Sequence, residues 1–166
     1  MNQISKKRST AAIYIEVPLK ARSSNVSACK GSVFVMYNYI CLLVSDLELS
    51  WYEAKQYCED QGGHLIVLDS EKKYNDTVDF IYTYYASISR KYLVGASDLA
   101  KEIQWKWMTS SGVNYFNFGD DQPNNVDVQF MDHPANCAAL SSVPPWTDGH
   151  LYDEYCSQKM RFICEM

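Results

Sequence analysis

The 166-residue sequence contains no Cys-x-x-Cys pair. Zinc sites usually draw ligands from such close pairs, so their absence argues against a zinc cage. The six cysteines are even in number and widely spaced, which is typical of disulfides, and disulfides indicate an oxidising, extracellular compartment. These cysteines are Cys29, Cys41, Cys58, Cys137, Cys156 and Cys164.

Long hydrophobic runs are also missing. The longest apolar run, residues 33–44, contains Asn38 and is too short to span a bilayer. Residues 11–19 form a short apolar patch that Glu16 interrupts, and no clean small-residue cleavage site follows it. We therefore expect a secreted or otherwise extracellular protein without membrane insertion, although no signal peptide is recognisable.

Lysine and arginine are absent from residues 109–158. By contrast, residues 1–28 carry a net charge of +4, which leaves −9 for the rest of a chain whose total is −5. An acidic field repels phosphate backbones and favours cations, so nucleic acid is not expected as a partner. The acidic stretch predicts either a cation site or a solvated loop surface. Its acidic residues are Asp120, Asp121, Asp127, Asp132, Asp148, Asp153 and Glu154.

Catalytic motifs are lacking as well. There is no Gly-x-Ser-x-Gly elbow and no pair of carboxylates placed by a recognisable acid–base motif, so we expect no enzymatic activity. With 47% hydrophobic residues, the chain is long enough to bury one core. Residues 1–28, rich in Ser, Lys and Arg without periodicity, are predicted to be a flexible basic tail, and residues 29–166 one domain.

Several regular elements are predicted. Ser50-Trp51-Tyr52-Glu53 has the form of a capping box that begins a helix, and Gly62-Gly63 ends that helix. Asp69 and Ser70 offer caps for a second helix, whose apolar face is predicted to hold Tyr74, Val78, Ile81 and Tyr85. Strands are expected within residues 32–46, 64–68, 92–96 and 103–108. Residues 110–153 are predicted to form a long loop, and a loop of that length is usually functional.

Together these landmarks resemble the C-type lectin-like domain in its long form, which has an extra amino-terminal hairpin. The resemblance covers residues 29–166 and implies an α+β fold in which two helices flank two small antiparallel sheets. It also implies disulfides Cys29–Cys41, Cys58–Cys164 and Cys137–Cys156. Besides the cysteines, the matching segments are Ser50-Trp51-Tyr52-Glu53-Ala54, Gly63-His64-Leu65, Tyr92-Leu93-Val94-Gly95, Trp105-Lys106-Trp107, Gln122-Pro123-Asn124 and Trp146-Thr147-Asp148.

In this family the long loop commonly holds calcium, which binds sugar directly. Carried over residue by residue, the ligand positions read Gln122, Asn124, Ala135, Thr147 and Asp148. Ala135 has no side-chain oxygen and Thr147 replaces an asparagine, so the implied metal ligands reduce to Gln122, Asn124 and Asp148. Such a site is expected to be weak, roughly in the millimolar class. Asp127 or Asp132 is a candidate substitute ligand.

The segment Gln122-Pro123-Asn124 also bears on specificity and on backbone shape. It is a hybrid of the mannose-type Glu-Pro-Asn and galactose-type Gln-Pro-Asp motifs, so it assigns neither sugar. The resemblance implies a cis peptide bond before Pro123, whereas the residues alone favour an ordinary Pro-Asn turn.

We therefore predict an extracellular carbohydrate-binding lectin. Gln122, Asn124, Thr147 and Asp148 are its candidate glycan contacts, acting through a weak or degenerate calcium site or through hydrogen bonds alone. The alternative is a calcium-independent protein-recognition module on the same fold, because fold alone does not decide between a glycan and a protein ligand.

Overall fold

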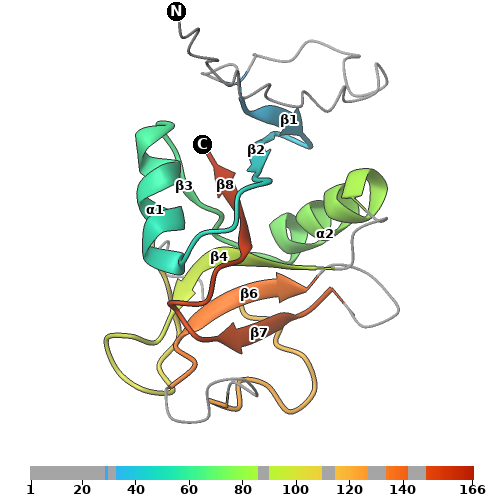
Figure 1. Cartoon of the computed structure of the whole chain (residues 1–166). Coiled ribbons are helices and arrows are strands. Elements are labelled where there is room, and N and C mark those ends of the chain that lie inside the picture. Colours follow the sequence, from blue (N-terminus) through green and yellow to red (C-terminus); the bar gives the residue numbers. More distant parts are fainter. Residues whose placement is uncertain (1–28, 30–32, 86–89, 110–114, 127–133, 142–148) are drawn as a thin grey trace, which may run out of the picture.

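A computed structural model describes Cys29 and residues 33–85, 90–109, 115–126, 134–141 and 149–166. In Figure 1 the β1–β2 hairpin lies at the top, β6 and β7 lie below, and α1 and α2 stand on either side of β8. The elements are β1 (Val35–Tyr37), β2 (Ile40–Val44), α1 (Trp51–Asp60), β3 (His64–Leu65), α2 (Glu71–Tyr85), β4 (Lys91–Ser97), β5 (Lys106–Trp107), β6 (Cys137–Ser141), β7 (Leu151–Glu154) and β8 (Arg161–Glu165).

The first helix begins where the capping box predicts. The Ser50 hydroxyl accepts a hydrogen bond from the Glu53 backbone N–H, and the Glu53 carboxylate accepts one from the Ser50 N–H, so two donors that the helix leaves without partners are satisfied. Helix α1 buries Trp51, Ala54 and Cys58. The Trp51 indole N–H donates to the Val94 carbonyl at 2.8 Å, which fixes the helix against β4.

The second helix also forms as predicted, but its buried face is rotated. Tyr74 and Ile81 are buried as expected, whereas Val78 and Tyr85 are only half-buried. Thr77 and Phe80 take the remaining buried positions. The Thr77 hydroxyl donates to the Lys73 carbonyl, so a polar side chain is accommodated inside without an unsatisfied group.

Two antiparallel groups make up the sheet, as the family resemblance implies. One contains β1, β2, β8 and β3, and the other contains β4, β5, β6 and β7. A short parallel pairing of β4 with β8 joins them in the order β1-β2-β8-β4-β6-β7. Among the described residues, no helix is both long and apolar enough to cross a bilayer.

The prediction of an uninterrupted loop over residues 110–153 is wrong, because this stretch contains β6 and most of β7. Strand β6 has the sequence Cys-Ala-Ala-Leu-Ser, which lacks β-branched and aromatic residues, yet all five residues are buried. Its position between β4 and β7 supplies hydrogen bonds on both edges. Tertiary packing has therefore overridden a weak local strand propensity.

The three disulfides pair as the resemblance implies: Cys29 with Cys41, Cys58 with Cys164, and Cys137 with Cys156. The second joins α1 to β8 across a sequence separation of 106 residues. Backbone segments approach closely beside it. A Cβ atom on Gly63 would lie 2.3 Å from the Glu165 carbonyl oxygen, so only glycine fits there.

The double substitution Cys58→Ala/Cys164→Ala is expected to lower the free energy of unfolding by about 4 to 5 kcal/mol, because this crosslink closes the longest loop. Removing Cys29–Cys41, which spans a separation of 12 residues, should cost about 3 kcal/mol. Urea denaturation of both variants measures the two losses. A larger loss for the hairpin crosslink would contradict the role assigned to the long-range disulfide.

Candidate functional site

The ends of neighbouring strands meet at one edge of the sheet. Asp98 directly follows β4, Asn136 directly precedes β6, and Asp153 lies in β7. The Asp98 backbone N–H donates to the Asn136 carbonyl at 3.2 Å, and Asp153 pairs with Ala138 in the adjacent ladder. Three oxygen-bearing residues from distant parts of the sequence are therefore gathered at this edge.

The segment that carries Gln122-Pro123-Asn124 runs along β7 and is fastened to it. Phe118 forms a parallel bridge with Leu151 near the start of β7. Farther along, the Asp153 carboxylate accepts hydrogen bonds from the backbone N–H groups of Asn124, at 3.2 Å, and Asn125, at 2.5 Å. One buried carboxylate thus holds two consecutive peptide groups.

The turn itself has an irregular backbone. The Gln122–Pro123 peptide bond is cis, which confirms the expectation from the family resemblance over the ordinary turn. Asn125 has a positive φ of 57°, a conformation that asparagine tolerates better than most residues. Its side-chain oxygen accepts a hydrogen bond from the Ala135 N–H at 2.9 Å, while the Asn124 side-chain oxygen accepts one from the Val126 N–H. Ala135 therefore anchors the loop through its backbone.

Burial and neighbouring charges raise the pKa values of carboxyl groups at this edge. Burial raises the pKa of Asp153, an effect that the N–H groups of Asn125 and Asn124 oppose and that the nearby Asp98 reinforces. Partial desolvation, followed by the charge of Asp98 and more weakly that of Asp153, raises the pKa of Glu102. Asp98, Glu102 and Asp153 therefore form one electrostatically coupled acidic group.

Two oxygens in this region lack hydrogen-bond donors. Within the described part of the chain, Asp98 Oδ1 and Asn136 Oδ1 are buried and accept no hydrogen bond, whereas Asp98 Oδ2 accepts one from the Ile103 N–H at 2.9 Å. Carboxylate and amide oxygens are the ligand atoms that calcium prefers, although a calcium ion takes six to eight of them. The chemical type of these two oxygens therefore fits calcium, but two oxygens are fewer than a calcium ion needs. Over the same residues, no group of three or more His, Cys, Asp or Glu side chains is arranged to hold a metal ion.

The sequence-predicted site residues are only partly placed. Gln122 and Asn124 lie on the loop that Asp153 holds. Thr147, Asp148, Asp127 and Asp132 lie outside the described residues. Asp153 and Asp98 were not predicted as site residues. Asp153 stands three residues before Cys156, whose disulfide to Cys137 aligns β7 with β6, and that spacing is the signal that would have identified Asp153.

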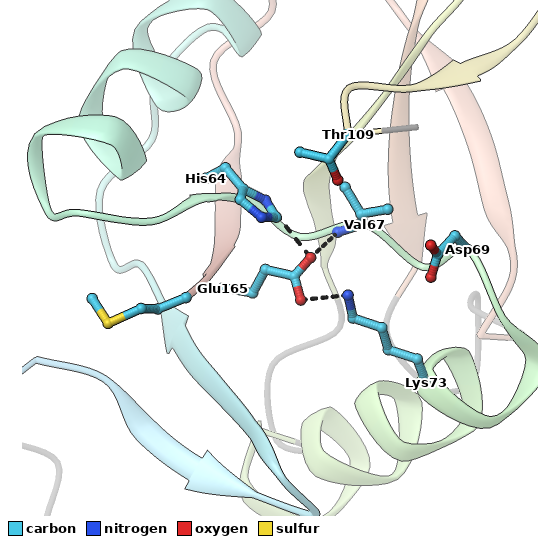
Figure 2. Close-up of a pocket in the computed structure, with 7 residues that line it drawn as sticks. His64, Val67, Asp69, Lys73, Thr109 and Glu165 are labelled. Atoms are coloured by element: carbon cyan, nitrogen blue, oxygen red, sulfur yellow. Dashed lines mark hydrogen bonds and ion pairs between the residues drawn. The ribbon is translucent and has the colours of Figure 1, made fainter. Parts of the chain in front are cut away.

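A separate pocket of about 460 Å³ lies between β3, β8 and α2. Figure 2 shows its Glu165 carboxylate directed towards His64, Val67 and Lys73. One oxygen accepts the Val67 backbone N–H at 2.8 Å and lies 3.6 Å from His64 Nδ1, and the other lies 2.5 Å from Lys73 Nζ. Because the chain itself satisfies this carboxylate, the cluster joins β8 to α2 and is not a free ligand-binding group.

The described residues have the fold of C-type lectins. A mouse scavenger receptor C-type lectin carbohydrate-recognition domain superposes with a TM-score of 0.65 at 24% identity, covering 81% of this chain and 94% of that one. A calcium-independent type II antifreeze protein superposes with a TM-score of 0.66 at 17% identity, covering 86% and 98%. These likenesses establish the fold.

Sequence comparison establishes the family. The family described as "Lectin C-type domain" matches residues 47–166, and the chain belongs to it. Asialoglycoprotein receptor 2 of Mus musculus is 30% identical over 144 residues, which is 86% of this chain and 44% of the receptor. The chain thus spans about half the length or less of the first curated relatives it matches.

Titration of Asp153 is expected to be visible in the loop that it holds. As pH falls, the backbone amide resonances of Asn124 and Asn125 should shift together, with a midpoint above the ordinary aspartate range, because burial raises the pKa of Asp153. NMR-monitored pH titration measures this midpoint. In Asp153→Asn the shared transition should vanish, whereas the exposed control Asp120→Asn should retain it. Persistence of the transition in Asp153→Asn would remove the assigned role.

Proposed function

We propose that residues 29–166 form an extracellular lectin domain that binds glycans at the loop 122–125, with residues 1–28 as a basic tail. The hydrogen bonds from Asn124 and Asn125 to Asp153 carry this proposal, because they hold an amide-bearing loop at the sheet edge. Family membership supports the ligand class, since the matched relative is a receptor for asialoglycoproteins by name and the matched domain is a carbohydrate-recognition domain. The three disulfides support the extracellular location.

The side chains offered to a sugar are those of Gln122, which is half-buried, and Asn124, which is exposed. A side-chain amide has a carbonyl acceptor and two N–H donors, which match the hydroxyl groups of a monosaccharide. The Asn124 oxygen already accepts the Val126 N–H, so Asn124 offers mainly its two N–H donors. Because Asp153 already orders the backbone beneath them, little loop entropy is lost when a sugar binds. Thr147 and Asp148 complete the proposed contact set.

We propose further that calcium contributes weakly. Asp98 Oδ1 and Asn136 Oδ1 are buried oxygens without donors, and the coupled carboxylates Asp98, Glu102 and Asp153 concentrate negative charge beside the loop. Asp98 and Asn136 would hold the ion together with Gln122, Asn124 and Asp148, with Asp127 or Asp132 in place of the oxygen that Ala135 lacks. When bound, the ion would supply positive charge to the sugar hydroxyls. The antifreeze protein of the same fold is calcium-independent by name, so the fold itself does not demand the ion.

Asn124→Ala is expected to weaken binding to the best glycan of a broad array about tenfold, which corresponds to losing one or two hydrogen bonds. Asn75→Ala is the matched control, since Asn75 is an exposed asparagine on α2. Its affinity should equal that of the wild type. Equal affinity in the Asn124→Ala variant would place the glycan elsewhere.

Calorimetric titration with calcium, with and without monosaccharide, tests the metal contribution. We expect a calcium dissociation constant roughly in the millimolar range, tightened when sugar is present, because the ligand set is short of anionic oxygens. Asp98→Asn should weaken calcium binding further. Glycan retention that is unaffected by a chelator would contradict the calcium contribution and leave the hydrogen-bonded mechanism in place.

The second candidate is a calcium-independent protein-recognition module. Ala135 favours this second candidate, because it places a side chain without oxygen at an implied calcium-ligand position. The array decides between the two, because a protein-recognition module would bind no glycan in the presence or absence of calcium.

A further inference from the structure

An exposed isoleucine near the site occupies an unfavourable backbone conformation. Ile103 has a φ of 68° and its side chain is 81% exposed. For a β-branched residue the left-handed region is sterically strained, and glycine or asparagine is the usual occupant. Isoleucine at this position therefore destabilises the folded backbone and exposes an apolar side chain to water. A glycine at the same position would have neither effect.

Hydrogen bonds connect Ile103 directly to the candidate site. Its backbone N–H donates to Asp98 Oδ2 at 2.9 Å, and the Asp98 N–H donates to the Asn136 carbonyl. Asn136 follows Ala135, whose N–H holds the Asn125 side chain of the proposed glycan loop. The loop that carries Ile103 is thus fastened to the same strand ends as the loop 122–125.

Other apolar side chains accompany Ile103 on these two loops. Leu99, on the same loop, is 43% exposed, and Val126, which immediately follows the proposed glycan loop, is 52% exposed. The ionisable neighbours Asp98, Glu102 and Asp153 are acidic, whereas Lys101, exposed on the same loop, is basic. Charges of both signs therefore lie near Ile103, while its own exposed side chain is aliphatic and favours contact with an apolar group.

We propose that Ile103 is a specificity-determining residue that contacts an apolar aglycone, such as an aryl or alkyl group, on a glycan held at residues 122–125. This inference rests on the proposed glycan-binding function and adds a ligand class to it. Contact with an apolar group would remove the exposed aliphatic surface of Ile103 from water, which offsets the unfavourable backbone conformation in the bound state.

The test compares phenyl and methyl glycosides of mannose, galactose, N-acetylglucosamine and N-acetylgalactosamine. The wild-type protein is expected to bind the phenyl form of its preferred sugar about tenfold more tightly than the methyl form, as burial of roughly 50 to 60 Å² of apolar surface implies. Ile103→Gly and Ile103→Asn should bind the two forms equally and keep the wild-type affinity for the methyl glycoside. Both variants should unfold at the same denaturant concentration as the wild type or at a higher one.

Tyr39→Gly is the matched control. Tyr39 is 95% exposed and also has a positive φ, of 72°. It lies in the turn between β1 and β2, where the adjacent Asn38 donates a hydrogen bond to Asp76 of α2. This variant should gain stability as Ile103→Gly does and keep the phenyl preference. Equal binding of phenyl and methyl forms by the wild type, or an unchanged preference in Ile103→Gly, would overturn the assignment to Ile103 alone. Failure to bind any glycoside would overturn the proposed glycan-binding function as well.

Discussion

The carboxylate of Asp153 is the contact on which the arrangement of the site depends. It lies on β7, the last strand of the sheet, and accepts hydrogen bonds from two consecutive peptide groups, those of Asn124 and Asn125. Without an acceptor at this position, two backbone N–H groups of the loop would need other partners, and an unpaired buried donor costs about 1 to 3 kcal/mol. The loop thus takes its position from the sheet and leaves its own exposed amides available to a ligand.

Asp153 can hold the loop only because β7 is itself held in place. The Cys137–Cys156 disulfide ties Cys156, two residues beyond the end of β7, to the start of β6, and β6 pairs with β4. Strand β4 is almost entirely buried and also pairs with β8, which the Cys58–Cys164 disulfide connects to α1. The disulfides therefore fix the strands, the paired strands fix the position of the Asp153 carboxylate, and this carboxylate fixes the loop.

Local signals in the sequence predicted those parts of the fold that local physics determines. The capping box at Ser50 and Glu53 placed α1 correctly, because its hydrogen bonds involve only neighbouring residues. Strand β6 was missed, since a Cys-Ala-Ala-Leu-Ser segment becomes a strand only between two partners. Asp153 was missed as a site residue because its role depends on the ladder register, and its spacing from Cys156 is informative only once the Cys137–Cys156 pairing is taken into account. Gln122 and Asn124 were found through their motif, while the roles of Thr147 and Asp148 remain predictions.

The way the loop is anchored also explains how the fold persists while the implied metal ligands diverge. Ala135 contributes its backbone N–H to Asn125, and every residue except proline can supply that group. Asp153 likewise contacts peptide groups of Asn124 and Asn125 and not their side chains. The side chain at position 135 can therefore change without loss of this contact of the loop. The fold can therefore be retained whether or not the protein binds calcium. Which ligand is bound depends on the individual oxygens and the exposed apolar groups at this edge of the sheet.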